Sequence, residues 1–382
     1  MKYHTQFVLS IAACLVATLP AQVAEGQDSQ KSSTDDAYVY VSSSPSTGVF
    51  QINGFSAASN GKLAAITGSP FSDNVTSMAV NGKYLFGIDG NSIDTFSVGP
   101  DGSLQEVSSI VAVSNGCGSI SSLFLDHTGS SLYDYDYDGD GICSNPTYQG
   151  FSVNNTNGAL TFLGTYGASE EFNGPMTFTG SDLYAYGSEC YHFDPQIYGF
   201  KRNSDGSLTV LNQNVPMPTL PAGAFYCPYL AAADPTNNVA VPVTPLNAST
   251  WQPVGPTQLA VYTADSSGNL TTHSTYQNMP STGVQSVTNL SPSPAGTLLA
   301  VAGTGGLQIF HFNGGNQITK YTKLLTTIEV DQMFWDNDNH LYGIAKAANK
   351  LFVLTVTPTN VSKAPGSPYT IGSPQNIIVQ PK

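Results

Sequence analysis

The sequence predicts an all-β protein, a seven-bladed β-propeller made of four-stranded antiparallel blades. Three observations carry this prediction. A Gly-x-Leu signature, sometimes in degenerate form, occurs seven times along the chain. Each copy follows two short apolar runs separated by turn residues such as Asn-Gly or Asp-Gly, which are strong hairpin signals. No convincing amphipathic helix interrupts this pattern.

The repeat is plainest at 81–107, which reads NGKYLFGIDGNSIDTFSVGPDGSLQEV. An apolar run (84–88) and an alternating run (93–98) lead through Pro-Asp-Gly to a closing run at 104–107, and 76–80 precedes them. These four segments predict one blade of four strands. The start of the fourth strand recurs at intervals of roughly 40–60 residues, at Leu63, Leu104, Leu160, Leu208, Leu270, Ile318 and Val361.

The other strands of each blade follow from the apolar and alternating runs before these anchors. The predicted second strands are 38–41, 84–88, 132–135, 183–186, 239–243, 298–302 and 341–344. The predicted third strands are 49–55, 93–98, 148–153, 196–200, 258–262, 307–312 and 350–356.

The two ends of the repeat region are complementary. The first unit begins directly at its second strand, 37–41, and the last unit is followed by one unpaired apolar run, 376–379. We expect the C-terminal run to join the N-terminal blade as its inner strand. The ring would then be closed, without the exposed sheet edges that invite aggregation.

The first residues predict export. Lys2 precedes an apolar run at 7–19, and Ala24-Glu25-Gly26 resembles a cleavage site, so 1–26 is predicted to be a signal peptide, 27–36 a disordered linker and 37–382 the propeller. The apolar run is too short to span a membrane. The expected location is secreted or periplasmic. Because 11–14 resembles a lipobox, a lipid anchor through Cys14 is the alternative.

The charge excludes several classes of partner. Lys plus Arg is 12 against Asp plus Glu 26, a formal net charge of -14, and Arg202 is the sole arginine. Such a chain repels nucleic acid and anionic lipid, and it binds phosphorylated substrates poorly without a metal. We expect a monomer whose partner is a small-molecule lactone, a glycan or a protein.

The chain resembles the lactonase-like seven-bladed β-propeller family in three features. They are the opening YVYVSS (38–43), the GSPF phrase (68–71, echoed at 366–369) and the repeated Asn/Asp-Gly-x-Leu turns. This family includes 6-phosphogluconolactonase and carboxy-cis,cis-muconate cyclase, and the resemblance covers about residues 37–380. It implies a lactone hydrolase, a type of carboxylic ester hydrolase, acting at the channel mouth. The family holds anionic substrates with arginine and histidine, which Arg202 and the blade 4 start, Met-Thr-Phe-Thr at 176–179, do not reproduce.

Long loops are expected on one face, where loops between strands two and three and between blades emerge. They belong to blades 3 to 5, and long loops on a rigid scaffold are where function concentrates. They are 136–146, 167–175, 187–195, 213–228 and 244–256. Cys117, Cys143, Cys190 and Cys227 fall there, and an even number in an exported chain predicts disulfides. We predict Cys117–Cys143 and Cys190–Cys227, with the other two connectivities open.

The candidate catalytic residues are acids, bases and a histidine that enter or occupy blade 4. Such side chains can activate water for attack on a lactone carbonyl. They are Glu170, Glu171, Glu189, His192 and Asp194. The alternative is ordinary surface polarity. His127, His273, His311 and His340 are expected to be structural.

The candidate metal ligands are Asp136, Asp138 and Asp140, which match the first half of a calcium loop. The closing glutamate of that loop is replaced by Thr147, so a solvated acidic insertion is the alternative to calcium.

The candidate ligand-binding residues are Phe225, Tyr226 and Trp251, which could stack on a sugar or pack the long loops. If no catalytic group converges at the mouth, the second hypothesis is a non-catalytic propeller that binds a glycan or protein through blades 3 to 5.

Overall fold

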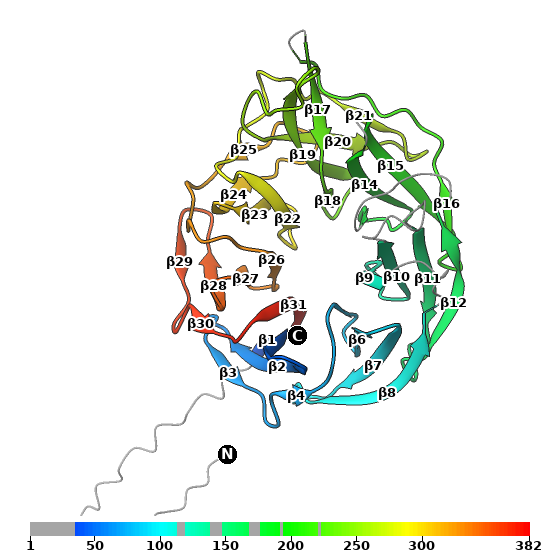
Figure 1. Ribbon diagram of the computed structural model, residues 1–382, viewed down its shortest axis with the longest axis vertical. Coiled ribbons are helices and arrows are strands. Elements are labelled where there is room, and N and C mark those ends of the chain that lie inside the picture. The colour runs from blue at the N-terminus through cyan, green and yellow to red at the C-terminus, as the bar shows by residue number, and fades with distance from the viewer. Residues whose placement is uncertain (1–34, 113–118, 138–146, 168–175, 192–193, 221–222) are drawn as a thin grey trace, which may run out of the picture. The chain divides into compact units, whose positions relative to one another are not determined.

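The computed structural model describes residues 35–112, 119–137, 147–167, 176–191, 194–220 and 223–382. Contacts divide the chain into Met1–Ser33 and Thr34–Lys382. The first unit, with the predicted signal peptide and Cys14, lies outside the described residues. The second contains seven antiparallel sheets that follow one another around a ring (Figure 1), which confirms the predicted seven-bladed β-propeller. The elements assigned in this part of the chain are all strands, and none of its residues forms a helix able to cross a membrane.

Blade 1 closes the ring as predicted. Its inner strand is β31 (Pro374–Pro381), which pairs antiparallel with β1 (Asp35–Ser46) in a register that includes Val39 opposite Val379. The strands β2 (Val49–Ala58) and β3 (Leu63–Ala65) continue outward, and β4 (Phe71–Ser72) also pairs with β2. The last strand of the chain therefore completes the first blade.

Blades 2 to 7 follow in chain order, each running from an inner to an outer strand. Blade 2 comprises β5 (Met78–Val80), β6 (Tyr84–Asp89), β7 (Ser92–Val98) and β8 (Leu104–Val111); blade 3 comprises β9 (Ser119–Leu125), β10 (Ser131–Tyr137), β11 (Thr147–Val153) and β12 (Leu160–Tyr166); blade 4 comprises β13 (Thr177–Phe178), β14 (Tyr184–Tyr191), β15 (Asp194–Arg202) and β16 (Leu208–Val210). Blade 5 comprises β17 (Ala224–Pro228), β18 (Ala232–Ala233), β19 (Asn238–Asn247), β20 (Gln258–Ala264) and β21 (Leu270–Thr272); blade 6 comprises β22 (Ser286–Pro292), β23 (Leu298–Thr304), β24 (Gly306–His311) and β25 (Thr319–Lys320); blade 7 comprises β26 (Gln332–Trp335), β27 (His340–Ala345), β28 (Lys350–Val356), β29 (Val361–Lys363) and β30 (Tyr369–Thr370).

The second and third strands occur where their apolar patterns predicted them, but blades 4 and 5 differ from expectation in length. The segments 187–195 and 244–256 were expected to be loops. Instead β14 continues to Tyr191 and β15 starts at Asp194, while β19 continues to Asn247 and pairs with β17. Much of the extra sequence therefore lengthens hairpins, which gives it a fixed position.

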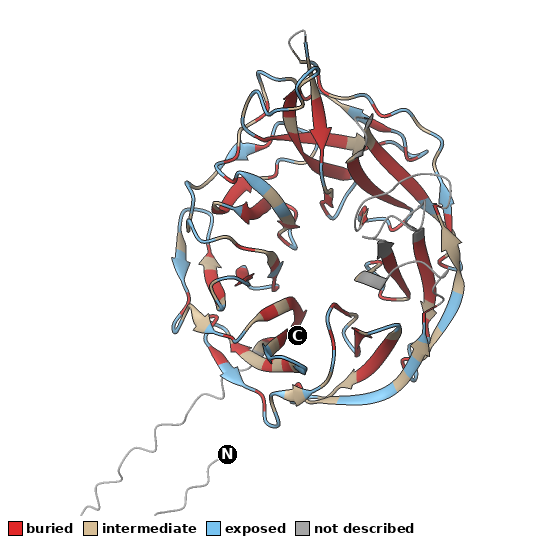
Figure 2. Cartoon of the chain, viewed as in Figure 1, coloured by how far each residue is buried: buried red, intermediate tan, exposed pale blue. Residues whose placement is uncertain are grey.

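The core lies between neighbouring blades, and the Gly-x-Leu turns are part of it. Tyrosines on the second strand of one blade donate hydrogen bonds to the turn of the next: Tyr40 to the Gly102 carbonyl at 2.8 Å, and Tyr186 to the Gly268 carbonyl at 2.8 Å. Tyr133 makes the same bond to Gly206 at 2.7 Å. Inner and middle strands are largely buried, whereas outer strands are more exposed (Figure 2).

Candidate functional site

The central channel is lined by the inner strands of all seven blades and encloses about 260 Å³. Its described lining consists of apolar, hydroxyl and amide side chains, with Asn289, Gln332 and Asn376 as the largest polar groups and Phe334 partly exposed. None of these lining residues is ionisable. The residues that line this cavity therefore offer no acid, base or fixed charge for a reaction.

The channel's polar atoms also tie the blades together. A side-chain oxygen on one inner strand accepts a hydrogen bond from a backbone N–H of the next blade, as Ser77 does from Leu123 at 3.3 Å. Asn289 accepts from Met333 at 3.2 Å, and Asn376 accepts from Met78 at 3.2 Å. These bonds satisfy groups that would be costly to leave unpaired, so they serve the ring.

Arg202 is a structural residue between blades 3 and 4. Its side chain is 13% exposed and its Nη2 atom lies 2.5 Å from the buried Asp126 carboxylate and 2.9 Å from Ser131 Oγ. The sole arginine is thus paired away from the channel, and it cannot hold an anionic substrate there.

A groove of about 410 Å³ lies between blades 5 and 6. Blade 5 contributes the long end of β19, the following loop and the turn at Tyr229, and blade 6 contributes the start of β22. The lining residues are Tyr229, Pro242, Thr244, Leu246, Trp251, Pro253, Thr257, Gln285, Ser286 and Val287. None of these lining residues carries a carboxylate, amine, guanidinium or imidazole group. Its volume is in the range of small-molecule sites.

One wall of the groove is aromatic. Trp251 has a left-handed backbone conformation (φ +63°), and its backbone N–H donates a hydrogen bond to the Asn247 carbonyl at 2.9 Å. The Phe225 ring packs edge-on against the indole, with centroids 4.6 Å apart and an interplanar angle of 60°. This support fixes Trp251 as a flat apolar surface, the kind that stacks on ligand C–H groups.

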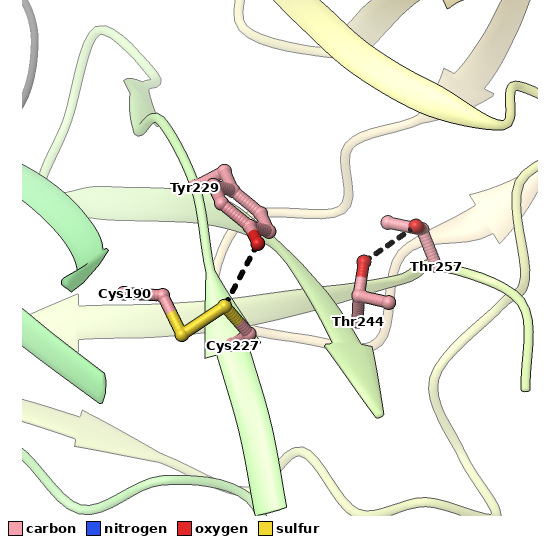
Figure 3. The surroundings of a disulfide bond; sticks show 5 residues. All are labelled: Cys190, Cys227, Tyr229, Thr244 and Thr257. Carbon is pink, nitrogen blue, oxygen red and sulfur yellow. Dashed lines mark hydrogen bonds between the residues drawn. A yellow bond between two sulfur atoms is a disulfide. The ribbon is translucent and has the colours of Figure 1, made fainter. Parts of the chain in front are cut away.

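The polar groups of the groove are neutral. Thr244 Oγ1 and Thr257 Oγ1 lie 2.7 Å apart across the β19–β20 hairpin (Figure 3). Gln285 is exposed and reaches the groove from the blade 6 side. Hydroxyls and an amide both donate and accept hydrogen bonds, so they suit a ligand with hydroxyl groups.

A disulfide supports the base of the groove. Cys190 at the end of β14 is bonded to Cys227 of β17, as predicted, with Cα atoms 5.2 Å apart. The Tyr229 hydroxyl lies 2.9 Å from Cys227 Sγ (Figure 3), and because a disulfide sulfur carries no hydrogen, the hydroxyl donates. Burial raises the pKa of Tyr229. The bridge therefore fixes blade 4 to β17, and Tyr229 of the groove follows that strand directly.

Glu189 is the one predicted catalytic side chain that the structure describes. It is 4% exposed. Side chains alternate along β14, and Cys190 faces blade 5, so Glu189 faces blade 3. There the Tyr148 and Tyr198 hydroxyls lie 2.8 Å apart. Burial raises the pKa of Tyr198 well above its ordinary value, and the Glu189 charge raises it further. Glu189 is thus an interior carboxylate beside two phenols.

The other predicted catalytic, metal and cysteine residues are not described to the level of their side chains. Asp194 begins β15 and Asp136 lies in β10, opposite Thr147. Glu170, Glu171, His192, Asp138, Asp140, Cys117 and Cys143 lie outside the described residues. Their convergence at one mouth, and calcium binding by the three aspartates, remain predictions.

The three predicted ligand-binding aromatics separate into two groups. Trp251 lines the groove with Phe225 behind it, whereas Tyr226 is 1% exposed and donates to Gln258 Oε1 at 2.7 Å. The sequence reasoning missed Tyr229, Thr244, Thr257 and Gln285. For Thr244 and Thr257 the one signal was the richness of 242–257 in proline and threonine, and Tyr229 and Gln285 lie outside that segment.

Three of the histidines that the structure describes contact side chains that hold strands or blades together. His340 Nδ1 lies 2.8 Å from the buried Asp336 carboxylate, which also accepts from the Tyr342 hydroxyl at 2.8 Å. His127 pairs with Asp182 at 2.8 Å, between blades 3 and 4, and the His311 ring packs against Tyr321.

Several solved structures share this fold. A protein from Bacteroides fragilis, provisionally named a 6-phosphogluconolactonase, has a TM-score of 0.65 at 13% identity, over 91% of this chain and 99% of that one. The periplasmic gluconolactonase PpgL of Pseudomonas aeruginosa has a TM-score of 0.63 at 14% identity, over 90% and 98% of the two chains. A Lactobacillus plantarum protein has a TM-score of 0.63 at 14% identity, over 91% and 99%. These identities show the lactonase-like propeller fold alone. No protein-family model matches the sequence, and no curated protein matches it.

Proposed function

We propose that this protein binds a neutral, polyhydroxylated small molecule, such as a sugar or sugar lactone, in the groove between blades 5 and 6. One observation carries the proposal: the groove combines an indole surface, Trp251, with hydroxyl and amide groups and no charged side chain. Such sites orient a ligand with a few polar groups over an apolar surface. A phosphorylated ligand would need basic side chains, which this lining lacks.

The fold likeness is compatible with a lactone as ligand. Among the similar structures, one is named a 6-phosphogluconolactonase and another a gluconolactonase. The buried ion pair of Arg202 and the net charge of -14 favour the unphosphorylated class for this chain. We also propose that the protein is exported, because the Cys190–Cys227 disulfide is typical of oxidising compartments.

Calorimetric titration with neutral sugars and sugar lactones tests the location of the site. Trp251→Ala removes the indole surface and should weaken binding at least tenfold, or by about 1.4 kcal/mol. The matched control is Phe334→Ala, because Phe334 is a partly exposed aromatic residue of the central channel. Loss of binding in Phe334→Ala with none in Trp251→Ala would move the site to the channel and contradict the proposal.

Lactone hydrolysis is a second candidate, and Glu189 favours it. A carboxyl group buried beside two tyrosine hydroxyls is a suitable acid or base when a neutral lactone reaches it. A panel of lactones, with and without calcium, tests for turnover. If turnover is found, Glu189→Gln should lower kcat at least a hundredfold, whereas Glu329→Gln, in the segment between blades 6 and 7, should not. Turnover unchanged in Glu189→Gln would remove Glu189 from the mechanism.

A further inference from the structure

Three amide side chains occupy one level of the central channel. Asn289 of blade 6, Gln332 of blade 7 and Asn376 of blade 1 each accept a backbone N–H from the next blade, at 3.2, 3.1 and 3.2 Å. That N–H belongs to the residue after the equivalent side chain, as Met333 follows Gln332 and Ile377 follows Asn376. The three amides therefore repeat one position in three consecutive blades, and all three line the channel cavity.

These bonds decide how each amide is oriented. An amide side chain has one acceptor oxygen and one NH2 donor group. Exchanging the two would set the NH2 group against a backbone N–H, so the partner fixes the assignment. None of the three NH2 groups has an acceptor among the described residues, and none is a buried atom. The NH2 groups are therefore open to the cavity and need an acceptor that the described chain does not supply.

Two hydroxyl groups of the lining follow the same rule. Ser77 Oγ accepts the Leu123 N–H at 3.3 Å, and Thr177 Oγ1 accepts the Ala233 N–H at 3.0 Å. Neither hydroxyl donates a bond to a described residue, so each keeps a hydrogen that it can donate. Because the side-chain oxygens are used to join the blades, the polar side chains of this cavity present mainly donors.

A cavity with uncharged donors and an apolar wall suits a halide ion. A halide accepts hydrogen bonds from any direction, so donors from three blades can share it. Met78, Leu123 and Phe334 supply apolar lining, and the polarizable thioether of methionine suits a polarizable ion. A divalent anion such as phosphate would need basic side chains, and none lines this cavity.

We propose that the channel binds one halide ion, such as chloride, through the NH2 groups of Asn289, Gln332 and Asn376. The ion would join blades 6, 7 and 1, and so support the blade that β31 completes. The net charge of -14 opposes every anion, but no lining residue is charged and salt screens the surface charges. The site is separate from the groove between blades 5 and 6, so either proposal can hold without the other.

Thermal unfolding during a sodium chloride titration tests the site, at an ionic strength kept constant with sodium methanesulfonate. Anomalous scattering from crystals grown in sodium bromide locates the ion. Asn289→Asp and Asn376→Asp keep the oxygen that accepts the backbone N–H and replace the NH2 group with a negatively charged oxygen. The control is Asn91→Asp, which adds the same charge at an exposed turn.

The wild type should show a saturable increase in Tm with chloride, and bromide should lie beside the three amides. Each of the two channel variants should raise the apparent Kd for chloride about tenfold or more, because like charges repel at short range. This Kd comes from the concentration dependence, so a lower starting Tm does not obscure it. Asn91→Asp should behave as the wild type.

Three results would overturn the proposal. The first is a wild type without a saturable chloride effect, even if bromide is found in crystals. The second is bromide bound only away from the amides. The third is an unchanged apparent Kd in both Asn289→Asp and Asn376→Asp.

Discussion

The glycine of each Gly-x-Leu turn has two separate roles, which Gly102 shows best. Its φ of +81° is a left-handed conformation that glycine adopts at little cost. In addition, an added Cβ would lie 2.7 Å from Tyr38 and Ile66 of the preceding blade. The signature therefore marks a close contact between blades as well as a turn.

Gly102→Ala should lower the free energy of unfolding by about 2–4 kcal/mol, because backbone strain and overpacking add. Gly90→Ala is the matched control. Gly90 also has a positive φ, +57°, in the same blade, but an added Cβ meets nothing within 4 Å, so about 1 kcal/mol is expected. Urea denaturation measures both, and equal losses would show that the inter-blade contact contributes nothing.

His340 should make stability depend on pH. Burial alone would lower its pKa, but the hydrogen bond with Asp336 and the negative charges of Asp336, Asp338 and Asp36 together outweigh burial and raise the pKa. A group whose pKa is raised by folding contributes its full stabilisation below its pKa in the unfolded chain, about 6.5 for histidine. That stabilisation is lost as the pH rises through the pKa of the folded state. Burial alone would raise the pKa of Asp336, but the hydrogen bonds from His340 and Tyr342 and the charge of His340 together lower it, so its contribution is lost only in acid.

The free energy of unfolding of the wild type, relative to His340→Gln, should therefore fall as the pH rises above about 6.5. His273→Gln is the control, because His273 is exposed, and its pH profile should parallel that of the wild type. Parallel profiles for all three proteins would refute the assignment.

At the scale of elements, β14, β17 and β19 form the unit that departs most from the plain repeat. β17 pairs with the far end of β19, while β18 pairs with the near end. The Cys190–Cys227 bridge then links β14 to β17 across 37 residues. The lengthened hairpins and the bridge together hold the blade 5 side of the groove.

Replacing both cysteines with alanine should lower the free energy of unfolding by about 4 kcal/mol, if the bridge acts by restricting the unfolded chain. It should also weaken ligand binding in the groove, because Tyr229 loses its contact with Cys227. With Cys117 and Cys143 also replaced by alanine, reductant should lower the stability of the protein that keeps the Cys190–Cys227 bridge and leave the variant without that bridge unchanged. Wild-type stability in the double variant would show that strand pairing alone holds these blades together.

The strands were predictable because their signals are local. Turn glycines, Asn-Gly pairs and alternating apolar residues lie within each unit, and even β31 could be recognised as a strand without a partner in its own blade. The lengths of β14 and β19 were not predictable, because polar and proline-containing segments such as 244–247 read as loops. Their pairing with β17 supplies the backbone hydrogen bonds that stabilise them as strands.

The groove was only partly predictable. Trp251 is visible in the sequence as an aromatic residue in a long insertion, whereas Gln285 and Ser286 belong to another blade. Their meeting depends on how two blades pack, which no spacing in the chain encodes. The burial of Tyr226 and Glu189 is likewise set by neighbouring blades.

At the scale of the whole propeller, ring closure and the proposed ligand site use different parts of the ring. Polar groups in the described channel bond one blade to the next, as Gln332 does to the Ile377 N–H of blade 1 at 3.1 Å. The sole arginine, Arg202, is paired with Asp126. The neutral groove between blades 5 and 6 is the site that we propose for a small molecule.

Fluorescence titration of Trp335→Phe tests this account most directly. The chain has two tryptophans, and Trp335 is buried in blade 7, so Trp251 in the groove becomes the single reporter. The ligands are neutral sugars and sugar lactones, each paired with its phosphorylated counterpart. We predict a saturable change in emission with neutral ligands and at least tenfold weaker binding of the phosphorylated ones. Tighter binding of the phosphorylated ligands, or unchanged emission throughout the panel, would contradict the account.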